Sequence, residues 1–187
     1  IVGQLLKDEE LLAEYRVAAN ILSISLFLLE ALLVFILPYF IQHIRDKKWI
    51  WENYKKLFAI NGVVMTVFHL GLFIFAKLYL YIFAGPEYMG AAPLVRMFLI
   101  ASWIQAVFRG ISGNILAVTG EEKFNLKINI VFVVLHAVID VAAVKMLGIY
   151  GAAIALIVVY LLSGLIMNLH LRNICKSQIG EITNDEK

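Results

Sequence analysis

Charged residues are scarce in this sequence of 187 residues. They make up 16% of it, against about 25% in soluble domains, while hydrophobic residues make up 62% and the mean hydropathy is +0.86. This composition excludes an ordinary soluble domain and predicts a membrane protein. The formal net charge of +2 is too small to suggest a nucleic-acid partner. The single cysteine, Cys175, excludes an intrachain disulfide.

Sequence motifs of catalysis and cofactor binding are also missing. The chain has no Gly-rich phosphate loop, no nucleophile elbow and no paired carboxylates on an aqueous loop. His136 and Asp140 stand four residues apart, as two metal ligands on a helix can, but no third or fourth ligand follows nearby. We therefore expect a protein that is not an enzyme and that holds neither a cofactor nor a metal.

Long apolar runs dominate what is present. A membrane-spanning helix needs about 20 mainly apolar residues, and the lack of alternation argues against membrane strands. The sequence thus predicts an all-α membrane protein, a polytopic helical bundle with about five transmembrane helices. These spans are predicted at Val17 to Ile41, Leu57 to Phe75, Leu94 to Val118, Phe124 to Leu147 and Ile149 to Leu171.

Basic residues predict how the spans are oriented. Residues 42–56 carry five lysines and arginines and should therefore be cytoplasmic, as should the tail 172–187. Trp49 and Trp51 among those lysines indicate an amphipathic segment at the inner headgroup level. On the outer side, residues 76–93 gather aromatic side chains around Gly85-Pro86, which is typical of an aromatic belt and a reentrant loop.

Polar residues form stripes on three of the predicted spans. At about 100° per residue, the members of each stripe fall within roughly 60° to 80° of one another. Ionisable groups at mid-bilayer are costly, so such stripes should face protein or water. We expect the first, third and fourth spans to line a common cavity. The stripes comprise Asn20, Ser23 and Glu30; Ser102, Gln105, Arg109 and Ser112; and Asn125, Asn129, His136 and Asp140.

A structural interpretation of the same charges stays open. Glu30, Arg109 and Asp140 can instead neutralise one another in a dry bundle and only fix its packing. For His136 a hydrogen bond across helices suffices as an explanation. The fifth span has no comparable stripe, but Gly151 and Ala155 form a small-xxx-small packing site.

Several short motifs follow one another in a recognisable order. The opening IVGQLLKDEELLAEYRVAANI carries Tyr15 and Ala18 at a helix entry, and Pro38 lies near the inner end of that helix. The loop IFAGPEYMGAAPLVRMF contains Gly85, Tyr88 and Ala91. GNILAVTGEEKFN closes the third span with a glycine, and GIYGAAIA opens the last one.

In these motifs the chain resembles the C-terminal half of polysaccharide-biosynthesis membrane proteins. These are the O-antigen (Wzx-like) flippases of the multidrug/oligosaccharidyl-lipid/polysaccharide exporter superfamily. The resemblance covers most of the chain, although Ala84 and Pro86 depart from the family's outer loop. It implies one half of an exporter-type transporter, with residues 1–187 as its C-terminal transmembrane bundle. Since the chain begins with Ile1, we expect the N-terminal half of the protein to precede it.

The resemblance also implies a function. A flippase of this kind moves an undecaprenyl-diphosphate-linked oligosaccharide from the inner to the outer leaflet of the bacterial inner membrane, for polysaccharide or O-antigen biosynthesis. Its partners would be that substrate, membrane lipid, the N-terminal half and a polysaccharide polymerase assembly. Arg109 suits a diphosphate through charge-assisted hydrogen bonds. In this interpretation Gln105 and Asn129 join it in binding substrate, and Glu30, His136 and Asp140 are counter-charges or ion-coupling sites.

Other functions remain as alternatives. A multidrug or cation antiporter of the same superfamily would use Glu30 and Asp140 to bind cations, whereas Arg109 argues against it. Export of a lipid-linked peptidoglycan precursor is a close variant. A membrane-embedded polysaccharide polymerase or glycosyltransferase generally needs a larger external loop than residues 76–93 offer.

Overall fold

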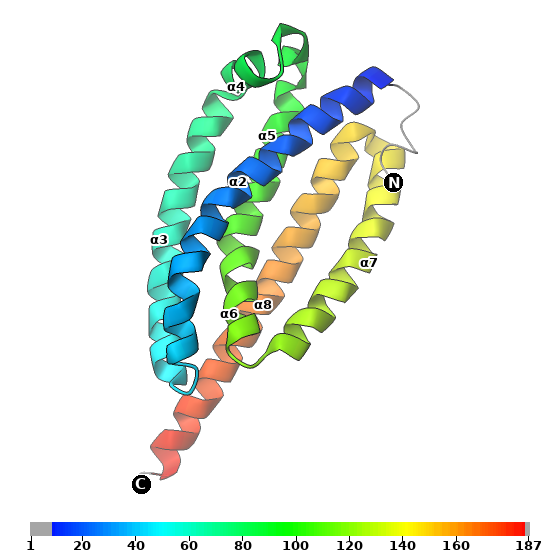
Figure 1. Cartoon of the computed structure of the whole chain (residues 1–187). Coiled ribbons are helices and arrows are strands. Elements are labelled where there is room, and N and C mark those ends of the chain that lie inside the picture. Colours follow the sequence, from blue (N-terminus) through cyan, green and yellow to red (C-terminus); the bar gives the residue numbers. More distant parts are fainter. Residues whose placement is uncertain (1–8, 186–187) are drawn as a thin grey trace.

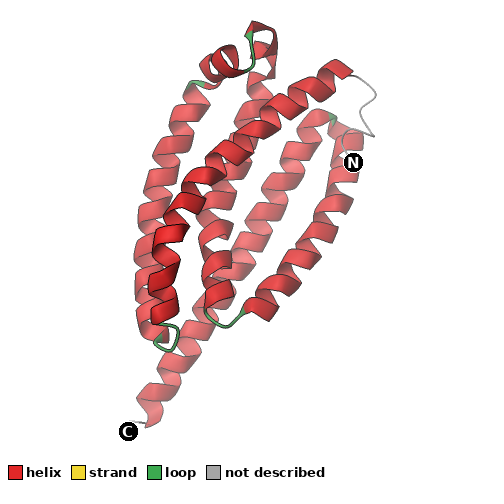
Figure 2. Cartoon of the chain, in the orientation of Figure 1, coloured by secondary structure: helices red, strands yellow, loops and turns green. Residues whose placement is uncertain are grey.

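The fold is an elongated bundle of helices. A computed structural model of the chain describes residues 9–185, and no strand occurs among them (Figures 1 and 2). This confirms the prediction of an all-α bundle. In chain order the elements are α2 (Glu9–Gln42), α3 (Lys47–Ile74), α4 (Ala76–Phe83), the 3-10 turn η1 (Pro86–Ala91), α5 (Ala92–Ile104), the π-helical turn η2 (Gln105–Gly110), α6 (Ile111–Val118), α7 (Glu122–Leu147) and α8 (Ile149–Asp185).

Five helices in the described part of the chain are long and apolar enough to cross a membrane. This is compatible with a multi-pass membrane protein. They comprise α2, α3, the continuous segment Pro86–Val118, α7, and α8 as far as Ser177. Each contains one predicted span, except that the predicted second span extends one residue past α3, to Phe75. The outward faces of these helices carry large exposed apolar side chains such as Phe27, Phe35 and Val133, which suits contact with lipid tails.

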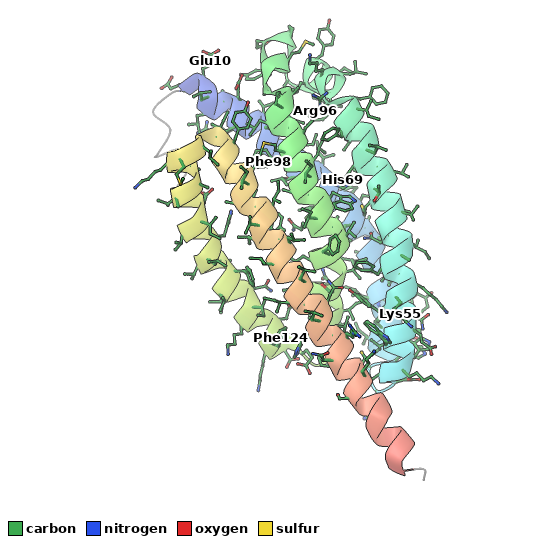
Figure 3. All side chains as sticks on the ribbon, turned by 180° about the vertical axis from the view of Figure 1, so that it is seen from behind. Glu10, Lys55, His69, Arg96, Phe98 and Phe124 are labelled. Atoms are coloured by element: carbon green, nitrogen blue, oxygen red, sulfur yellow. The ribbon has the colours of Figure 1, made fainter. Side chains whose placement is uncertain are left out.

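The two ends of the bundle differ in charge. The loops α2–α3 and α6–α7 and the C-terminal end of α8 lie at one end, whereas α4, η1 and the α7–α8 turn lie at the other (Figure 1). Figure 3 shows Lys55 and Phe124 near the first end, and Glu10 and Arg96 near the opposite one. The predicted alternation of the spans therefore brings all the basic segments assigned to the cytoplasm to a single end.

Two charged segments that lie outside the predicted spans continue the helices. Residues 47–56, predicted as a separate interfacial segment, form the first turns of α3, where the Asp46 carboxylate caps the helix by accepting from Trp49 N at 2.8 Å. The tail predicted at 172–187 continues α8 as far as Asp185 and projects beyond the bundle (Figure 1). In both segments the helix therefore continues past the apolar run into charged residues.

The predicted outer loop is built from two short helical pieces. α3 ends at Ile74, and after the single residue Phe75 the next helix, α4, begins at Ala76. Between α4 and η1 the chain turns at Gly85, whose φ of 110° lies in a region that side chains disfavour. The segment remains at one end of the bundle, packed through Leu80 and Ala91.

Close contact between α7 and α8 depends on a small residue. A side-chain carbon at Gly151 would overlap the main-chain carbonyl of Ala143. Ala155, one turn further along, is fully buried. The predicted small-xxx-small packing site is therefore where the backbones of α7 and α8 approach each other.

Candidate functional site

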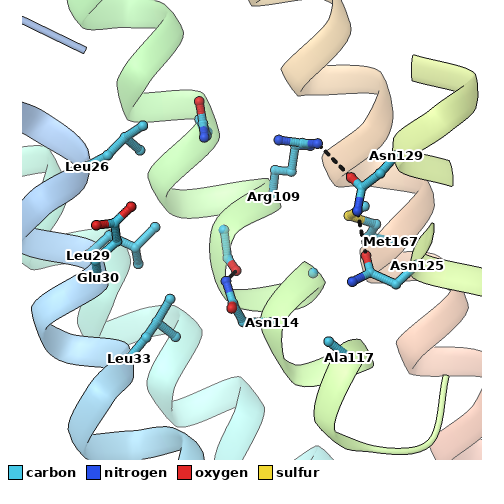
Figure 4. Close-up of a pocket in the computed structure, with 13 residues that line it drawn as sticks. Leu26, Leu29, Glu30, Leu33, Arg109, Asn114, Ala117, Asn125, Asn129 and Met167 are labelled. Carbon is cyan, nitrogen blue, oxygen red and sulfur yellow. Dashed lines mark hydrogen bonds between the residues drawn. The ribbon is translucent and has the colours of Figure 1, made fainter. Parts of the chain in front are cut away.

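A pocket of about 410 Å³ lies between α2, α7 and the η2–α6 segment, with α8 behind it (Figure 4). Its α2 side is formed by three leucines and one carboxylate, and the facing side by amides, glycines and one guanidinium. The lining residues are Leu26, Leu29, Glu30, Leu33, Gln105, Arg109, Gly110, Gly113, Asn114, Ala117, Asn125, Asn129 and Met167. One wall is therefore mainly apolar and the other mainly polar.

Arg109 supplies the positive charge of the polar wall. Its Nη2 donates to Asn129 Oδ1 at 2.7 Å, and Asn129 Nδ2 in turn donates to Asn125 Oδ1 at 3.4 Å (Figure 4). The guanidinium carbon lies 5.6 Å from the ring centre of Tyr160 on α8. These partners are all neutral, so they orient the guanidinium without cancelling its charge.

Two buried polar atoms near the pocket lack a hydrogen-bond partner within the described residues. They are Arg109 Nε, a donor, and Gln105 Oε1, an acceptor. Buried polar atoms are nearly always paired in folded proteins. Both atoms belong to side chains that line the pocket, but the two atoms themselves are covered by protein.

The stripe predicted on the third span is divided by η2. A π-helix bonds residue i to residue i+5, so the angles of an ideal α-helix do not continue through it. Ser102 lies outside the pocket, and its hydroxyl is 3.0 Å from His69 Nε2 of α3. Ser112 is buried, and its hydroxyl donates to Phe108 O at 2.8 Å. Only Gln105 and Arg109 of that stripe line the pocket.

Glu30 lies on the α2 wall, across the pocket from Asn129 (Figure 4). Its side chain is exposed and forms no ion pair with Arg109. Among the side chains that the structure describes up to residue 177, the one contact between a basic and an acidic group is His170 Nε2 to Glu121 Oε2, at 3.1 Å. Glu30, Arg109 and Asp140 thus form no direct ion pair with one another in this structure. The other two members of the α2 stripe, Asn20 and Ser23, are exposed and lie outside the pocket.

The stripe predicted on α7 is also divided. Asn125 and Asn129 line the pocket, whereas His136 and Asp140 do not. Asp140 lies eleven positions after Asn129, about 16 Å further along an α-helix at 1.5 Å per residue. It is only 7% exposed, and Nε2 of His136 is buried without a partner among the described residues. Spacing predicted the shared face of these residues correctly, but it could not show that the pocket ends before His136.

Sequence reasoning missed several contributors to the site, among them Asn114 of α6 and two residues of α8. Tyr160 and Met167 come from α8, which was predicted to have no polar stripe, and they approach Arg109 and the pocket from behind. Neither side chain differs in type from the many apolar and aromatic residues of the spans, so the sequence carries no signal for them. Among the side chains that the structure describes, no group of three or more His, Cys, Asp or Glu residues is placed to hold a metal ion.

Cysteine accessibility should separate the two halves of the α7 stripe. In a Cys175→Ser background, Asn129→Cys should react with a small water-soluble thiol reagent, since it lines the pocket. Asp140→Cys should be protected at least tenfold in rate, because its position is buried. Mass spectrometry of the labelled protein in membranes measures both rates. Equal rates at Asn129 and Asp140 would show that the cavity extends along the whole stripe.

Comparisons with protein-family models, with curated proteins and with solved structures give no significant match to this chain. The likeness to polysaccharide exporters thus rests on the motifs in the sequence alone. The chemistry of the pocket is the remaining guide to function.

Proposed function

We propose that this bundle belongs to a transporter that flips a lipid-linked oligosaccharide with a diphosphate headgroup. The substrate would move from the inner to the outer leaflet of a bacterial inner membrane, as in the flippases that the sequence resembles. The observation that carries the proposal is Arg109, a guanidinium that faces a pocket and has no carboxylate partner within the described residues.

The two walls of the pocket suit an amphipathic anion. Arginine holds phosphate groups through a planar fork of N–H donors, and hydrogen bonds with one charged partner contribute about 1.5–3 kcal/mol. Asn125 and Asn129 add amide groups that can bond phosphate or sugar oxygens. Leu26, Leu29 and Leu33 offer apolar contact on the opposite wall. A headgroup with a prenyl chain requires both kinds of surface.

Glu30 supports a second candidate, the multidrug or cation antiporter. Its exposed carboxylate lines the same pocket and would attract a cation. Arg109 on the polar wall opposes that role, because a cation would meet an uncompensated positive charge. We therefore rank the anionic substrate first and assign Glu30 a proposed role as counter-charge or ion-coupling group.

The charge of the ligand distinguishes these functions. The purified protein in detergent should bind undecaprenyl diphosphate roughly 10–100-fold more tightly than undecaprenol, as expected from one charged hydrogen-bonding group at about 1.4 kcal/mol per tenfold. Binding is measured by titration followed through intrinsic tryptophan fluorescence. Equal affinities would contradict the proposal, and preferential binding of tetraphenylphosphonium would favour the antiporter.

A further inference from the structure

The π-helical turn η2 lies immediately beside the pocket and contains Arg109 near its end. A π turn changes the main-chain bonding from i→i+4 to i→i+5, which leaves carbonyl groups available to partners outside the helix. In a buried or lipid-facing segment such carbonyls have to be satisfied by side chains of neighbouring helices. The partners of the η2 carbonyls therefore decide whether this turn is held in place.

Two asparagines from different helices bind carbonyls of η2. Asn61 of α3 is fully buried, and its Nδ2 donates to Ala106 O at 3.1 Å. Asn168 of α8 donates from Nδ2 to Phe108 O at 2.6 Å and to Gly164 O of its own helix at 2.7 Å. The turn is thus held by amide donors from two neighbouring helices.

The amide of Asn168 is itself oriented by α3, the helix that carries Asn61. Its Oδ1 accepts a hydrogen bond from the Tyr54 hydroxyl of α3. With the oxygen engaged in this way, the Nδ2 group is directed at Phe108 O. Ser112 donates to the same carbonyl at 2.8 Å, so Phe108 O has two side-chain donors.

Gly164 brings α8 against the same residues. A side-chain carbon at this position would lie 2.9 Å from Phe108 Cβ, 3.0 Å from Phe108 C and 3.2 Å from Arg109 N. Those distances are shorter than van der Waals contact, so only glycine allows α8 to approach here. The main chain on either side of the Phe108–Arg109 bond is therefore in contact with α8.

We infer that Asn168 and Asn61 are positioning residues, which hold η2 as a π turn and thereby direct the Arg109 guanidinium towards Asn129 and the pocket. Neither asparagine lines the pocket. If η2 returned to α-helical bonding, the side chains after the turn would rotate by about 100° relative to those before it, which is the rotation of one residue in an α-helix. Arg109 would then lose its hydrogen bond to Asn129. This inference rests on the proposed role of Arg109 in binding the diphosphate.

The test is a double-mutant cycle on undecaprenyl diphosphate binding by the purified protein. Asn168→Leu, which has a similar volume but no donor, should weaken binding at least tenfold, as Arg109→Ala does. The double variant should bind no more weakly than Arg109→Ala alone. A guanidinium that points away from the pocket contributes as little to binding as an absent one, so the second change has nothing further to remove. A thermal melt of each variant shows which proteins are folded, and affinity is compared among folded proteins only.

Ser163→Ala is the matched control. Ser163 is a buried polar residue of the same helix, adjacent to Gly164, but its hydroxyl donates only to carbonyls of α8 itself. This variant should bind like the wild type. If Asn168→Leu does not fold, Asn168→Ser carries the same prediction, since serine can still bond to the preceding turn of its own helix but is too short to reach Phe108.

The outcomes separate the inference from the proposed function. If the wild type does not prefer undecaprenyl diphosphate over undecaprenol, both are overturned. If Arg109→Ala weakens binding while the folded Asn168 variant binds like the wild type, the positioning role is wrong and the proposed function stands. If the losses from Asn168→Leu and Arg109→Ala multiply in the double variant, Asn168 acts on binding independently of Arg109, which also contradicts the inference.

Discussion

Replacing Arg109 by alanine should reduce export of the lipid-linked oligosaccharide at least tenfold while the protein remains in the membrane at its normal amount. The guanidinium is the single positive charge among the pocket-lining residues, and loss of one charge-assisted contact of about 1.5–3 kcal/mol lowers affinity by roughly 10–100-fold. Arg109→Lys should retain part of the activity, because it keeps the charge but loses the planar fork. Export is measured as polysaccharide at the cell surface.

Arg96→Ala is the control for this loss. Arg96 also lies on the Pro86–Val118 segment, but its Nε donates to Phe73 O at 3.2 Å and it does not line the pocket. Export should continue in this variant. If Arg109→Ala exports normally, the anion-binding role is wrong. If it disappears from the membrane, Arg109 has a structural role in the bundle.

Replacing Gly151 by valine should destabilise the bundle more than any single change in the pocket. The first added carbon would overlap the Ala143 carbonyl, a main-chain group that cannot turn aside as a side chain can. Overpacking in well-packed regions costs about 1–3 kcal/mol and occasionally more, and valine would force α7 away from α8. The expected result is a lower midpoint of thermal unfolding in detergent, with loss of protein from the membrane.

Gly71→Ala is the matched control for that change. Gly71 is also a helical glycine, but no atom lies within 4 Å of the position its side-chain carbon would occupy. Alanine is favoured over glycine in helices by up to about 1 kcal/mol, so this variant should be as stable as the wild type or slightly more stable. A Gly151→Val protein that melts with the wild type would show that α7 and α8 are not in close contact.

The spans and their order could be predicted because they follow from general physics. A membrane helix needs about 20 mainly apolar residues with few charges. This criterion placed one predicted span on each of α2, α3, α7 and α8, with only Phe75 falling outside its helix. Helix ends were predicted less well. An apolar run indicates which residues lie in the lipid. The main-chain hydrogen bonding of the helices, however, continues beyond those runs into the polar residues 47–56 and 172–185.

The candidate site could be predicted in part for the same reason. A fixed angle per residue placed Asn125 with Asn129 and Gln105 with Arg109 correctly on shared faces, and both pairs line the pocket. It failed for Ser102 and Ser112, since an interruption of the α-helix lies between them.

The π turn itself could not be predicted. The residues QAVFRG form an ordinary apolar sequence, and the turn is held by amide donors from α3 and α8 that are distant in sequence. Long-range contacts of this kind leave no local pattern. The one trace in the sequence is the presence of isolated asparagines within otherwise apolar spans, such as Asn61 and Asn168, whose amides can bond across helices.

The central claim is that the pocket beside Arg109 holds the anionic headgroup. Photo-crosslinking with an undecaprenyl-diphosphate sugar that carries a photoreactive group next to the diphosphate tests it most directly. We expect crosslinks within residues 105–117 and 125–129. Unlabelled undecaprenyl diphosphate should suppress them, and undecaprenol should not. Crosslinks confined to the outward apolar face of α7, around Val133 and Val138, would contradict it.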